Sequence, residues 1–413
     1  MKTRISIALA VLTVMALVAT ACGPSPTATP VPTATAAVTP TPAAETLIIG
    51  NASILSGPGT GFGIPQSRGV EKGTELVNAA GGIKVGSKRY MIKLNTYDWG
   101  YTADGGRAGA EKLLNDGVKI IIGCGTGTSV GAQQVTEPNK ALLFYGGTAD
   151  SLVDKAHPYT FRILMGTRDG YMPTVTYARD QNPGNRKYFG TSYNDATGKI
   201  VYGQTEQAVK ALSWETFESK LYEPGTTDFA PFVTGYLMPS GANFLLMVSR
   251  TGEAGLLMKA ARQYGYKGII VWPSAAGGLP EFQIAGQAAD GAILTQDWDW
   301  SGPYIGDEMK KLAVEYNTQY GSYPTMLFLN AVDAVRMIKA AVELSGSTDA
   351  TAMRDAMPRI EWDSVFGGKG KLASVGDRPG ATVVHLMPVA KYDYAANKLV
   401  NVAQAIPPDK WTK

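Results

Sequence analysis

Apolar residues recur along this chain in two alternating patterns, short runs typical of buried strands and longer stretches with helical spacing. Residues 46–53 and 90–97 predict strands, and residues 64–80 between them have the length of a helix. A helical pattern over 102–116 and a buried-looking strand over 118–122 follow at once. The N-terminal part of the body therefore reads as successive strand–helix–strand units.

The same alternation continues through the rest of the body. Further strands are expected at 141–145, 187–193, 244–248, 268–272 and 292–295, and helices at 198–212, 255–264 and 325–344. This spacing predicts an α/β fold of parallel sheets with helices on both faces, in which ligands bind beyond the carboxyl ends of the strands. Because 413 residues are too many for one hydrophobic core, we expect two domains.

Composition and charge narrow the range of functions. A net charge of +3 gives no basic stripe for nucleic acid, and no apolar stretch of membrane-spanning length follows the N-terminal region. Only 2 Cys and 2 His are present, which argues against a zinc cluster. The P-loop pattern and the H-E-x-x-H pattern are both missing from the sequence, so we expect no cofactor and no metal.

The first residues predict an export signal over 1–21. Lys2 and Arg4 precede an apolar run, and small residues lead directly into Cys22. The arrangement resembles a bacterial lipoprotein signal, in which the first mature residue is a lipid-modified Cys, although Ala19 stands where Leu is commoner. An ordinary secretory signal or an uncleaved anchor is the alternative. All three interpretations place the body outside the cytoplasm.

Residues 22–45 predict a tether. Six Pro and six Thr with no charge occur between residues 23 and 44, a composition that favours extended polyproline conformations and cannot bury apolar surface. Removal of Lys2 and Arg4 with the leader lowers the basic count from 38 to 36 against 35 acidic residues, leaving a nearly neutral protein. Cys124 is then the one remaining thiol, and we interpret it as buried and free.

Several motifs occur in the order and spacing of one known family. They are Ser56-Gly57-Pro58, Arg68-Gly69, the run NAAGGI at 78–83, Tyr97-Asp98, the run NDGV at 115–118, the run GEAG at 252–255 before a helix ending in RQYGY at 262–266, Phe366-Gly367-Gly368 and Gly376-Asp377. Together they resemble the type I periplasmic binding proteins of the branched-chain amino-acid transporter group, over about residues 46–402.

The resemblance implies two α/β lobes joined by three crossing strands, which close over a small ligand and deliver it to an ABC permease with a cytoplasmic ATPase. The first lobe would comprise 46–163 and 296–384, and the second 164–295 and 385–413. Closure needs a ligand that contacts both lobes. A monomer anchored to the membrane through Cys22 is expected. A surface sensor that signals to a membrane receptor would use the same clamp.

The resemblance also assigns ligand contacts in the first lobe. Phe62 stands where the family has an aromatic residue against the ligand, with lobe packing as the alternative. The loop at 124–129 would present a hydroxyl and backbone N–H groups to a carboxylate, and Thr126, Thr128 and Ser129 are all candidates. Capping of the following helix is the other interpretation of these residues. Gly146 and Thr148 stand where the family binds the ligand's amine.

In the second lobe the family's pocket aromatics align with Thr197 and Arg250, and its amine-binding acid aligns with Ser274. Loss of that acid makes a plain branched-chain amino acid doubtful, because an unpaired buried ammonium is costly. Arg250 would hold a second acid group or belong to the solvated rim.

Aromatic residues follow or end predicted strands near the cleft, namely Tyr193, Trp272, Trp298 and Trp300, and they suit a flat ligand unless they belong to the core. Asp297 and Asp299 could replace the missing acid. We therefore expect a small ligand with at least one carboxylate, either an amino acid or an aromatic-type acid.

An enzyme is the remaining alternative. Residues 127–131 satisfy the G-x-S-x-G pattern of a serine hydrolase with Ser129 as nucleophile and His385 downstream. The predicted geometry differs, because residues 123–126 would form a long Gly-rich loop between the strand and the pattern. His385 also precedes what reads as a strand. We therefore expect a binding protein that is not an enzyme.

Overall fold

The computed structural model describes residues 44–404, apart from 185, 213, 215, 274–278, 296–299, 301, 303–304 and 386–387. The predicted leader, tether and Cys22 lie outside the described residues, as do Ser274, Asp297, Trp298 and Asp299. Within the described residues, no helix combines the length and the apolar character that crossing a bilayer would need. The His, Cys, Asp and Glu side chains of that same part form no group of three or more that could hold a metal ion.

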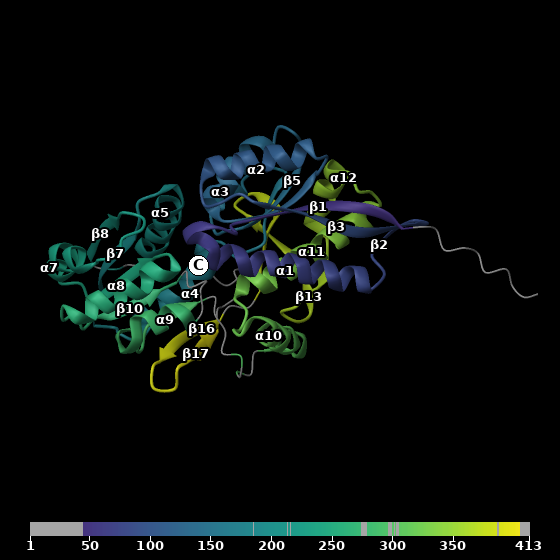
Figure 1. Cartoon of the computed structure of the whole chain (residues 1–413). Coiled ribbons are helices and arrows are strands. Elements are labelled where there is room, and N and C mark those ends of the chain that lie inside the picture. Colours follow the sequence, from purple (N-terminus) through teal and green to yellow (C-terminus); the bar gives the residue numbers. More distant parts are fainter. Residues whose placement is uncertain are drawn as a thin grey trace, which may run out of the picture. The chain divides into compact units, whose positions relative to one another are not determined.

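Two large sheets organise the fold (Figure 1). The first sheet has the strand order β14-β15-β6-β5-β4-β1-β3-β2. Its strands are β1 (Glu45–Ser53), β2 (Ile83–Val85), β3 (Lys88–Asp98), β4 (Ile120–Cys124), β5 (Leu142–Gly146), β6 (Thr160–Arg162), β14 (Leu372–Val375) and β15 (Arg378–Val383). The helices in this part of the chain are α1 (Thr60–Ala79), α2 (Ala103–Asn115), α3 (Thr126–Thr136), α10 (Asp307–Tyr320), α11 (Met326–Ser345) and α12 (Ala350–Ala356).

The second sheet has the order β17-β16-β11-β10-β9-β7-β8. Its strands are β7 (Lys187–Tyr193), β8 (Thr216–Tyr222), β9 (Phe244–Val248), β10 (Ile269–Trp272), β11 (Ile293–Thr295), β16 (Pro388–Asp393) and β17 (Lys398–Gln404). Its helices are α4 (Thr167–Asp180), α5 (Ala196–Lys210), α6 (Ala230–Phe232), α7 (Met238–Ser240), α8 (Thr251–Gln263) and α9 (Leu279–Ala285). A two-stranded sheet joins β12 (Trp362–Asp363) to β13 (Lys369–Gly370).

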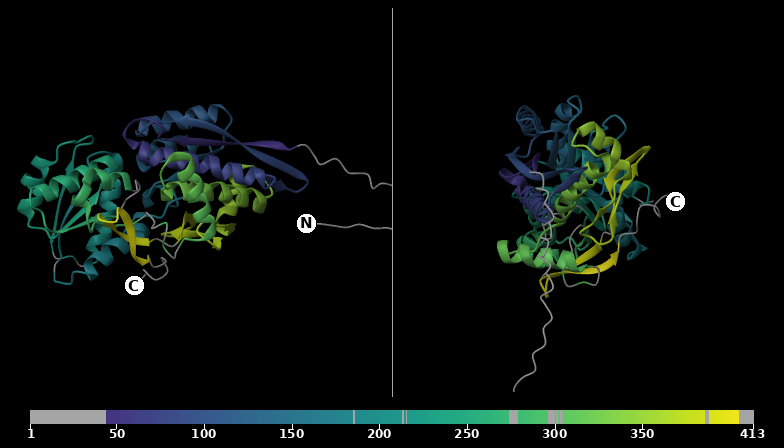
Figure 2. Two further views of the ribbon diagram at one scale, coloured as in Figure 1. Left: turned by 60° about the horizontal axis from the view of Figure 1, so that its bottom comes forward. Right: turned by 90° about the vertical axis from the view of Figure 1, so that its right-hand side faces the viewer.

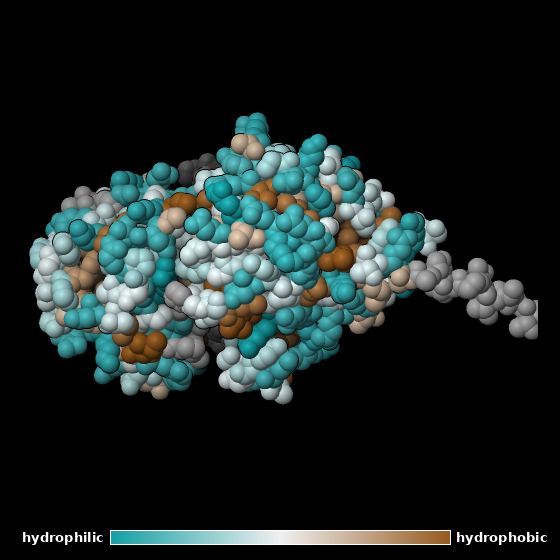
Figure 3. All heavy atoms as spheres, turned by 45° about the horizontal axis from the view of Figure 1, so that its top comes forward, coloured by the Kyte–Doolittle hydropathy of each residue, from teal (hydrophilic) through white to brown (hydrophobic). Residues whose placement is uncertain are grey.

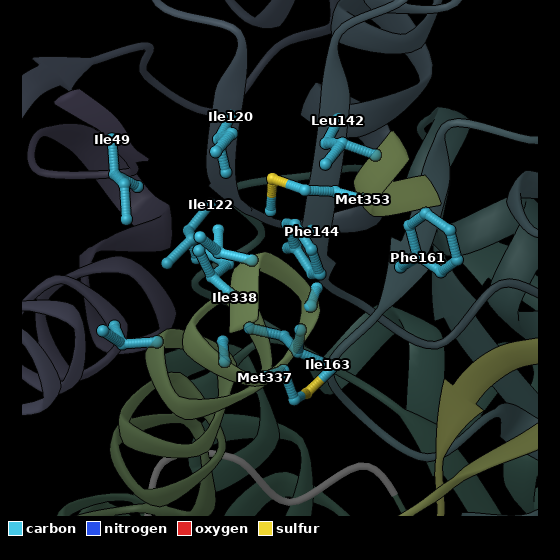
Figure 4. Packing of buried hydrophobic residues seen from close by; sticks show 14 of the residues in the cluster. Ile49, Ile120, Ile122, Leu142, Phe144, Phe161, Ile163, Met337, Ile338 and Met353 are labelled. Carbon is cyan, nitrogen blue, oxygen red and sulfur yellow. The ribbon is translucent and has the colours of Figure 1, made fainter. Parts of the chain in front are cut away.

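Alternation of side chains along the strands places helices on both faces of each sheet. In β4, Ile120 and Ile122 belong to a core shared with α1 and α11, whereas Ile121 belongs to the core shared with α2 and α3. Figure 4 shows Ile120 and Ile122 with Met337 and Ile338 of α11 in the first of these cores. In the second sheet, α8 and α9 pack on one face and α4 on the other.

Side-chain caps fix the starts of helices α2 and α5. Thr102 caps α2 by accepting a hydrogen bond from the Gly105 N–H at 3.0 Å, and Asp195 caps α5 by accepting from the Gly198 N–H at 2.9 Å. These caps satisfy N–H groups that have no partner inside the helix. They also fix the first turn of each helix at the carboxyl end of the preceding strand.

The prediction of an α/β fold with helices on both sheet faces is confirmed, and the edges show one difference. The central strands are parallel, but β2–β3, β14–β15, β11–β16 and β16–β17 are antiparallel. The pairs β2–β3 and β16–β17 are hairpins with connections too short for a crossover helix. The C-terminal strands, drawn toward yellow in Figure 2, lie at one edge of each sheet, β14 and β15 in the first and β16 and β17 in the second. Helix α11, late in the sequence, packs beside α1.

Two local expectations were wrong. The strand predicted at 118–122 lies instead at Ile120–Cys124, because Gly123 and Cys124 pair with Tyr145 and Gly146. Helix α3 begins at Thr126. Gly125 alone separates them, so no long loop precedes the G-x-S-x-G pattern, which lies inside α3. The GEAG run at 252–255, expected before a helix, lies at the start of α8. An acidic residue such as Glu253 is favourable there because the N-terminus of a helix carries partial positive charge.

Candidate functional site

A pocket lies at the carboxyl ends of strands from both sheets. Its empty space is about 550 Å³, including the part open to solvent. The lining residues are Phe62, Tyr101, Gly125, Thr126, Gly146, Gly147, Thr148, Leu164, Tyr171, Tyr193, Thr197, Val201, Val248, Ser249 and Leu327. The position agrees with the rule that parallel α/β sheets bind ligands beyond their strand ends.

The start of α3 forms the first-sheet wall of the pocket. Gly125 turns the chain with a φ of 90° and donates its N–H to the Gly146 carbonyl at 2.8 Å. The Thr126 hydroxyl then accepts a hydrogen bond from the Thr148 N–H at 3.3 Å. Two loops that each follow a strand are thereby joined, and the positive end of α3 lies next to two threonine side chains in the lining.

The other two hydroxyl candidates of this loop do not line the pocket. The Thr128 hydroxyl donates to the Cys124 carbonyl and lies 3.0 Å from the Gly125 carbonyl, so it supports the turn. The Ser129 side chain is fully buried in α3, and its hydroxyl has no hydrogen-bond partner among the described residues. The structure thus brings Thr126 to the pocket and places Thr128 and Ser129 behind it.

The start of α5 forms part of the second-sheet wall. Tyr193 ends β7, and Thr197 is the second residue of α5, directly after the Asp195 cap. Ser249 follows β9 and donates to or accepts from the Tyr222 hydroxyl at 2.6 Å. A second helix N-terminus and two more hydroxyl groups therefore border the pocket.

Arg250 does not line the pocket but lies beside it. Its guanidinium carbon is 4.7 Å from the ring centre of Tyr101 and 4.6 Å from that of Tyr193. A guanidinium N–H donates to Asp195 at 2.5 Å, and Glu253 lies 3.9 Å away. Nearby negative charge and the two tyrosines raise the pKa of Arg250 even though burial opposes its charge. The side chain is therefore a paired cation.

Apolar side chains complete the lining. Phe62 stacks near Tyr101 with ring centres 6.4 Å apart and packs with Leu164 and Leu327. Val201 and Val248 lie on the second-sheet side. Among the lining residues that the structure describes, none is acidic or basic. The pocket thus combines hydroxyl groups and helix N-termini with an apolar wall.

The remaining candidates lie elsewhere. Trp272 is fully buried in the second-sheet core, and Trp300 stacks on Tyr323 with ring centres 5.9 Å apart. Cys124 is fully buried, and burial raises the pKa of its thiol to about 12, so the thiolate needed for reaction is disfavoured. His385 Nε2 lies 3.1 Å from the Asn330 amide oxygen.

Six of the residues predicted from the sequence line the pocket, namely Phe62, Thr126, Gly146, Thr148, Tyr193 and Thr197. Sequence reasoning missed Tyr101 and Ser249, although both lie just after strands, where a search of every strand end would have found them. Leu164 also lies just after a strand, but that strand, β6, was not among the predicted ones. Tyr171 and Leu327 gave no such signal, because they lie in helices whose approach to the pocket depends on tertiary packing.

Known proteins resemble this chain over most of its length. It is 27% identical over 327 residues to the Leu/Ile/Val-binding protein homolog 3 of Brucella melitensis, which covers 76% of this chain and 85% of the relative. The closed conformation of a leucine-, isoleucine-, valine-, threonine- and alanine-binding protein from Brucella ovis has a TM-score of 0.76 at 19% identity, covering 90% of this chain and 97% of that one.

An ABC-transporter solute-binding protein from Rhodopseudomonas palustris, solved with 3,4-dihydroxybenzoic acid, has a TM-score of 0.71 at 17% identity, covering 88% of this chain and 99% of that one. At these identities the two solved structures establish the fold alone. The periplasmic binding protein family itself matches residues 46–397. The chain therefore belongs to the periplasmic binding protein family, whose members bind small molecules outside the cytoplasm as components of ABC transporters.

Proposed function

We propose that this protein is the solute-binding lipoprotein of an ABC importer and that its ligand is a small organic molecule with a carboxylate and an apolar body. The observation that carries this proposal is the pocket itself, which draws its lining from the carboxyl ends of strands in both sheets. A ligand held there contacts both sheets at once. Such a ligand favours the closed arrangement of a two-lobed binding protein.

The carboxylate end of the ligand fits the side where α3 and α5 begin. Backbone N–H groups at two helix N-termini carry partial positive charge, and Thr126, Thr148 and Thr197 add hydroxyl donors. Charge-assisted hydrogen bonds of this kind hold an anion without burying a countercharge. The buried pair of Arg250 and Asp195 is already neutral and leaves this task to the hydroxyls.

The apolar body of the ligand fits the side formed by Phe62, Leu164 and Val248. An α-ammonium group lacks an acidic partner among the described lining residues, so an acid without an amine suits them directly. The Brucella relatives bear the names of branched-chain amino-acid binders. For an amino acid, Asp297 or Asp299 would have to supply the carboxylate.

The lobes would be 46–163 with 296–384 and 164–295 with 385–413. The distribution of strands supports this division, because β1–β6, β14 and β15 form one sheet, and β7–β11, β16 and β17 form the other. The chain passes between the sheets after β6, after β11 and after β15. Hinge motion at these three passages would open and close the pocket, and the permease would receive the ligand from the closed form.

Residues 1–45 would supply the membrane attachment, with cleavage before Cys22 and lipidation of its thiol. A sensor for a membrane receptor would use the same pocket, and genes for a permease and an ATPase beside this one would favour transport.

The serine hydrolase is not supported, because Ser129 is buried in α3 and the relatives are binding proteins. We expect no labelling of Ser129 by a fluorophosphonate.

The test is a thermal-shift screen of the mature chain carrying Cys22→Ser. Aliphatic amino acids form one group, and aromatic or aliphatic acids without an amine form the other. A ligand at 100 times its dissociation constant stabilises the folded state by about 2.7 kcal/mol, which a melting curve resolves. A hit in either group, confirmed by calorimetry, supports the proposal and identifies the class. A complete lack of shift and heat with both groups contradicts it.

A further inference from the structure

Three side chains beside the pocket form a stack that joins the two sheets. Tyr101 comes from the loop after β3 of the first sheet, whereas Tyr193 ends β7 and Arg250 follows β9 of the second. The Arg250 guanidinium lies within 4.7 Å of both ring centres, and the two tyrosine hydroxyls are 3.3 Å apart. Tyr101 is thus the one member of the stack that belongs to the first sheet.

The second sheet fixes Arg250 in place. Asp195 accepts a hydrogen bond from Arg250 and at the same time caps α5 through the Gly198 N–H. Glu253, 3.9 Å from Arg250, accepts hydrogen bonds from the Gly225 N–H at 2.6 Å and the Tyr222 hydroxyl at 3.0 Å. The Arg250 side chain is only 7% exposed. It therefore offers a rigid, desolvated cation to whatever covers its free side.

The first sheet supplies that cover through Tyr101. Separation of the two lobes would remove the Tyr101 ring from the guanidinium and break the contact between the hydroxyls. Cation–π contacts are strongest when the cation is desolvated, as Arg250 is. Tyr101 and Tyr193 line the pocket but Arg250 does not, so the guanidinium supports the closed pocket from outside the lining.

We propose that Tyr101, Tyr193 and Arg250 form a latch that holds the lobes closed and sets how long a bound ligand stays. The proposal rests on the proposed function for its effect on ligand release, whereas its effect on lobe closure needs no ligand. Arg250 is accordingly a positioning residue and not the binding partner of a ligand anion. Its action is to shift the equilibrium between open and closed forms toward the closed form.

The first experiment measures closure in the full chain without ligand. In the chain carrying Cys22→Ser, cysteines replace Lys112 on α2 and Lys259 on α8, both exposed, for labelling with a fluorescent donor and acceptor, while the fully buried Cys124 stays unlabelled. Tyr101→Leu removes the first-sheet ring but leaves the pair of Arg250 and Asp195 intact. We expect the closed population to fall about tenfold relative to the open one. An unchanged distribution would overturn the latch.

The second experiment measures ligand dissociation by stopped flow, using a compound found in the thermal-shift screen. Tyr101→Leu and Arg250→Met should each raise the dissociation rate about tenfold, with Tyr101→Phe between wild type and Leu because it keeps the ring. Arg262→Met is the matched control, since Arg262 stacks on Tyr266 within the second lobe, 5.7 Å from its ring centre. It should leave the rate unchanged.

The two experiments separate the possible failures. If Arg250→Met does not fold, Tyr101→Leu still tests the latch from the first-sheet side. If no compound binds, the proposed function fails, but the ligand-free measurement still decides whether the stack holds the lobes together. Equal dissociation rates for wild type, Tyr101→Leu and Arg250→Met would overturn the latch even if the ligand is found.

Discussion

Gly127 of α3 lies against Thr197 of α5. A Cβ atom at this position would lie 2.3 Å from the Thr197 hydroxyl oxygen, a distance that real Cβ contacts do not reach. Gly127→Ala should therefore act as a wedge in the closed form and lower ligand affinity about tenfold, as calorimetry would measure. The melting temperature without ligand should not fall, because Ala favours a helix more than Gly.

Gly203→Ala on α5 is the control, since a Cβ atom there meets nothing within 4 Å. It should leave affinity unchanged. Equal affinities for Gly127→Ala and wild type would show that α3 and α5 do not approach in the ligand-bound form.

Thr126 is the residue most directly placed to bind a ligand carboxylate. Thr126→Val keeps the shape of the side chain but removes the hydroxyl, and a hydrogen bond to a charged group contributes about 1.5 to 3 kcal/mol. We expect ligand affinity to fall at least about tenfold in calorimetry. Thr318→Val, on the exposed face of α10, should have no effect. Normal binding by Thr126→Val would remove this hydroxyl from the site.

At the level of elements, Asp333 of α11 fastens the turn after β12. Its carboxylate accepts hydrogen bonds from the Val365 N–H at 2.9 Å and the Ser364 hydroxyl at 2.5 Å. Burial raises the pKa of Asp333 to about 6, because the charged form is poorly solvated. The carboxyl therefore stabilises the fold most in its neutral form, below the unfolded pKa near 4, and this contribution is lost as pH rises through 6.

Asp333→Asn should remove this pH dependence, since the amide offers similar hydrogen bonds without the charge. The difference in unfolding free energy between variant and wild type should grow by about 3 kcal/mol in favour of the variant from pH 4 to pH 7. Urea denaturation at each pH measures it. Asp363→Asn, on an exposed side chain, should not reproduce the trend. Parallel curves for Asp333→Asn and wild type would contradict the buried titration.

The sequence predicted the buried elements better than the edges. Strands β7 and β9 have the predicted bounds. The sequence of β9, FLLMV, is a continuous apolar run, and that of β7, KYFGTSY, is rich in aromatic and β-branched or small residues and ends before polar Asn194. Strand β8 was missed, since its sequence TFESKLY mixes charges into a strand at the sheet edge. Helix α8 begins four residues before its predicted start, and this start was missed because Gly252 and Gly255 weaken the helical pattern there.

The site was predictable where its residues follow strands and where family motifs fix the register. Thr126, Thr148 and Thr197 are of this kind. The contact of Tyr101 with Arg250 was not predictable, because no local pattern relates two residues on different sheets. The aligned position of Arg250 pointed toward the ligand, whereas its observed partners are Asp195 and two tyrosine rings.

For the molecule as a whole, the proposed role of residues 1–45 is to attach the pocket-bearing body to a membrane. Cys22→Ser should abolish incorporation of labelled palmitate and move the protein from the detergent phase to the aqueous phase in a cloud-point separation. Ligand affinity should not change, since residues 46–397 match the binding family without the leader. Retention of wild-type Cys22 protein in the aqueous phase would contradict lipidation.

Exposed apolar side chains are scattered on the surface. Figure 3 shows a face on which hydrophilic residues predominate, with apolar residues in small separate areas. The large exposed apolar side chains include Tyr236, Val314 and Leu344. Val314 is 58% exposed, and the other two are at most half exposed. Scattered exposure of this kind is ordinary for soluble proteins.

The late position of α11, β15 and β16 in the chain has a consequence for biosynthesis. Helix α11 packs on α1 over the first sheet, β15 joins that sheet beside β6, and β16 joins the second sheet beside β11. Neither sheet is complete before almost the whole polypeptide has been made, and contacts between such distant segments form slowly. In the export that we propose, folding would therefore be completed only after the last strands have emerged from the secretion channel.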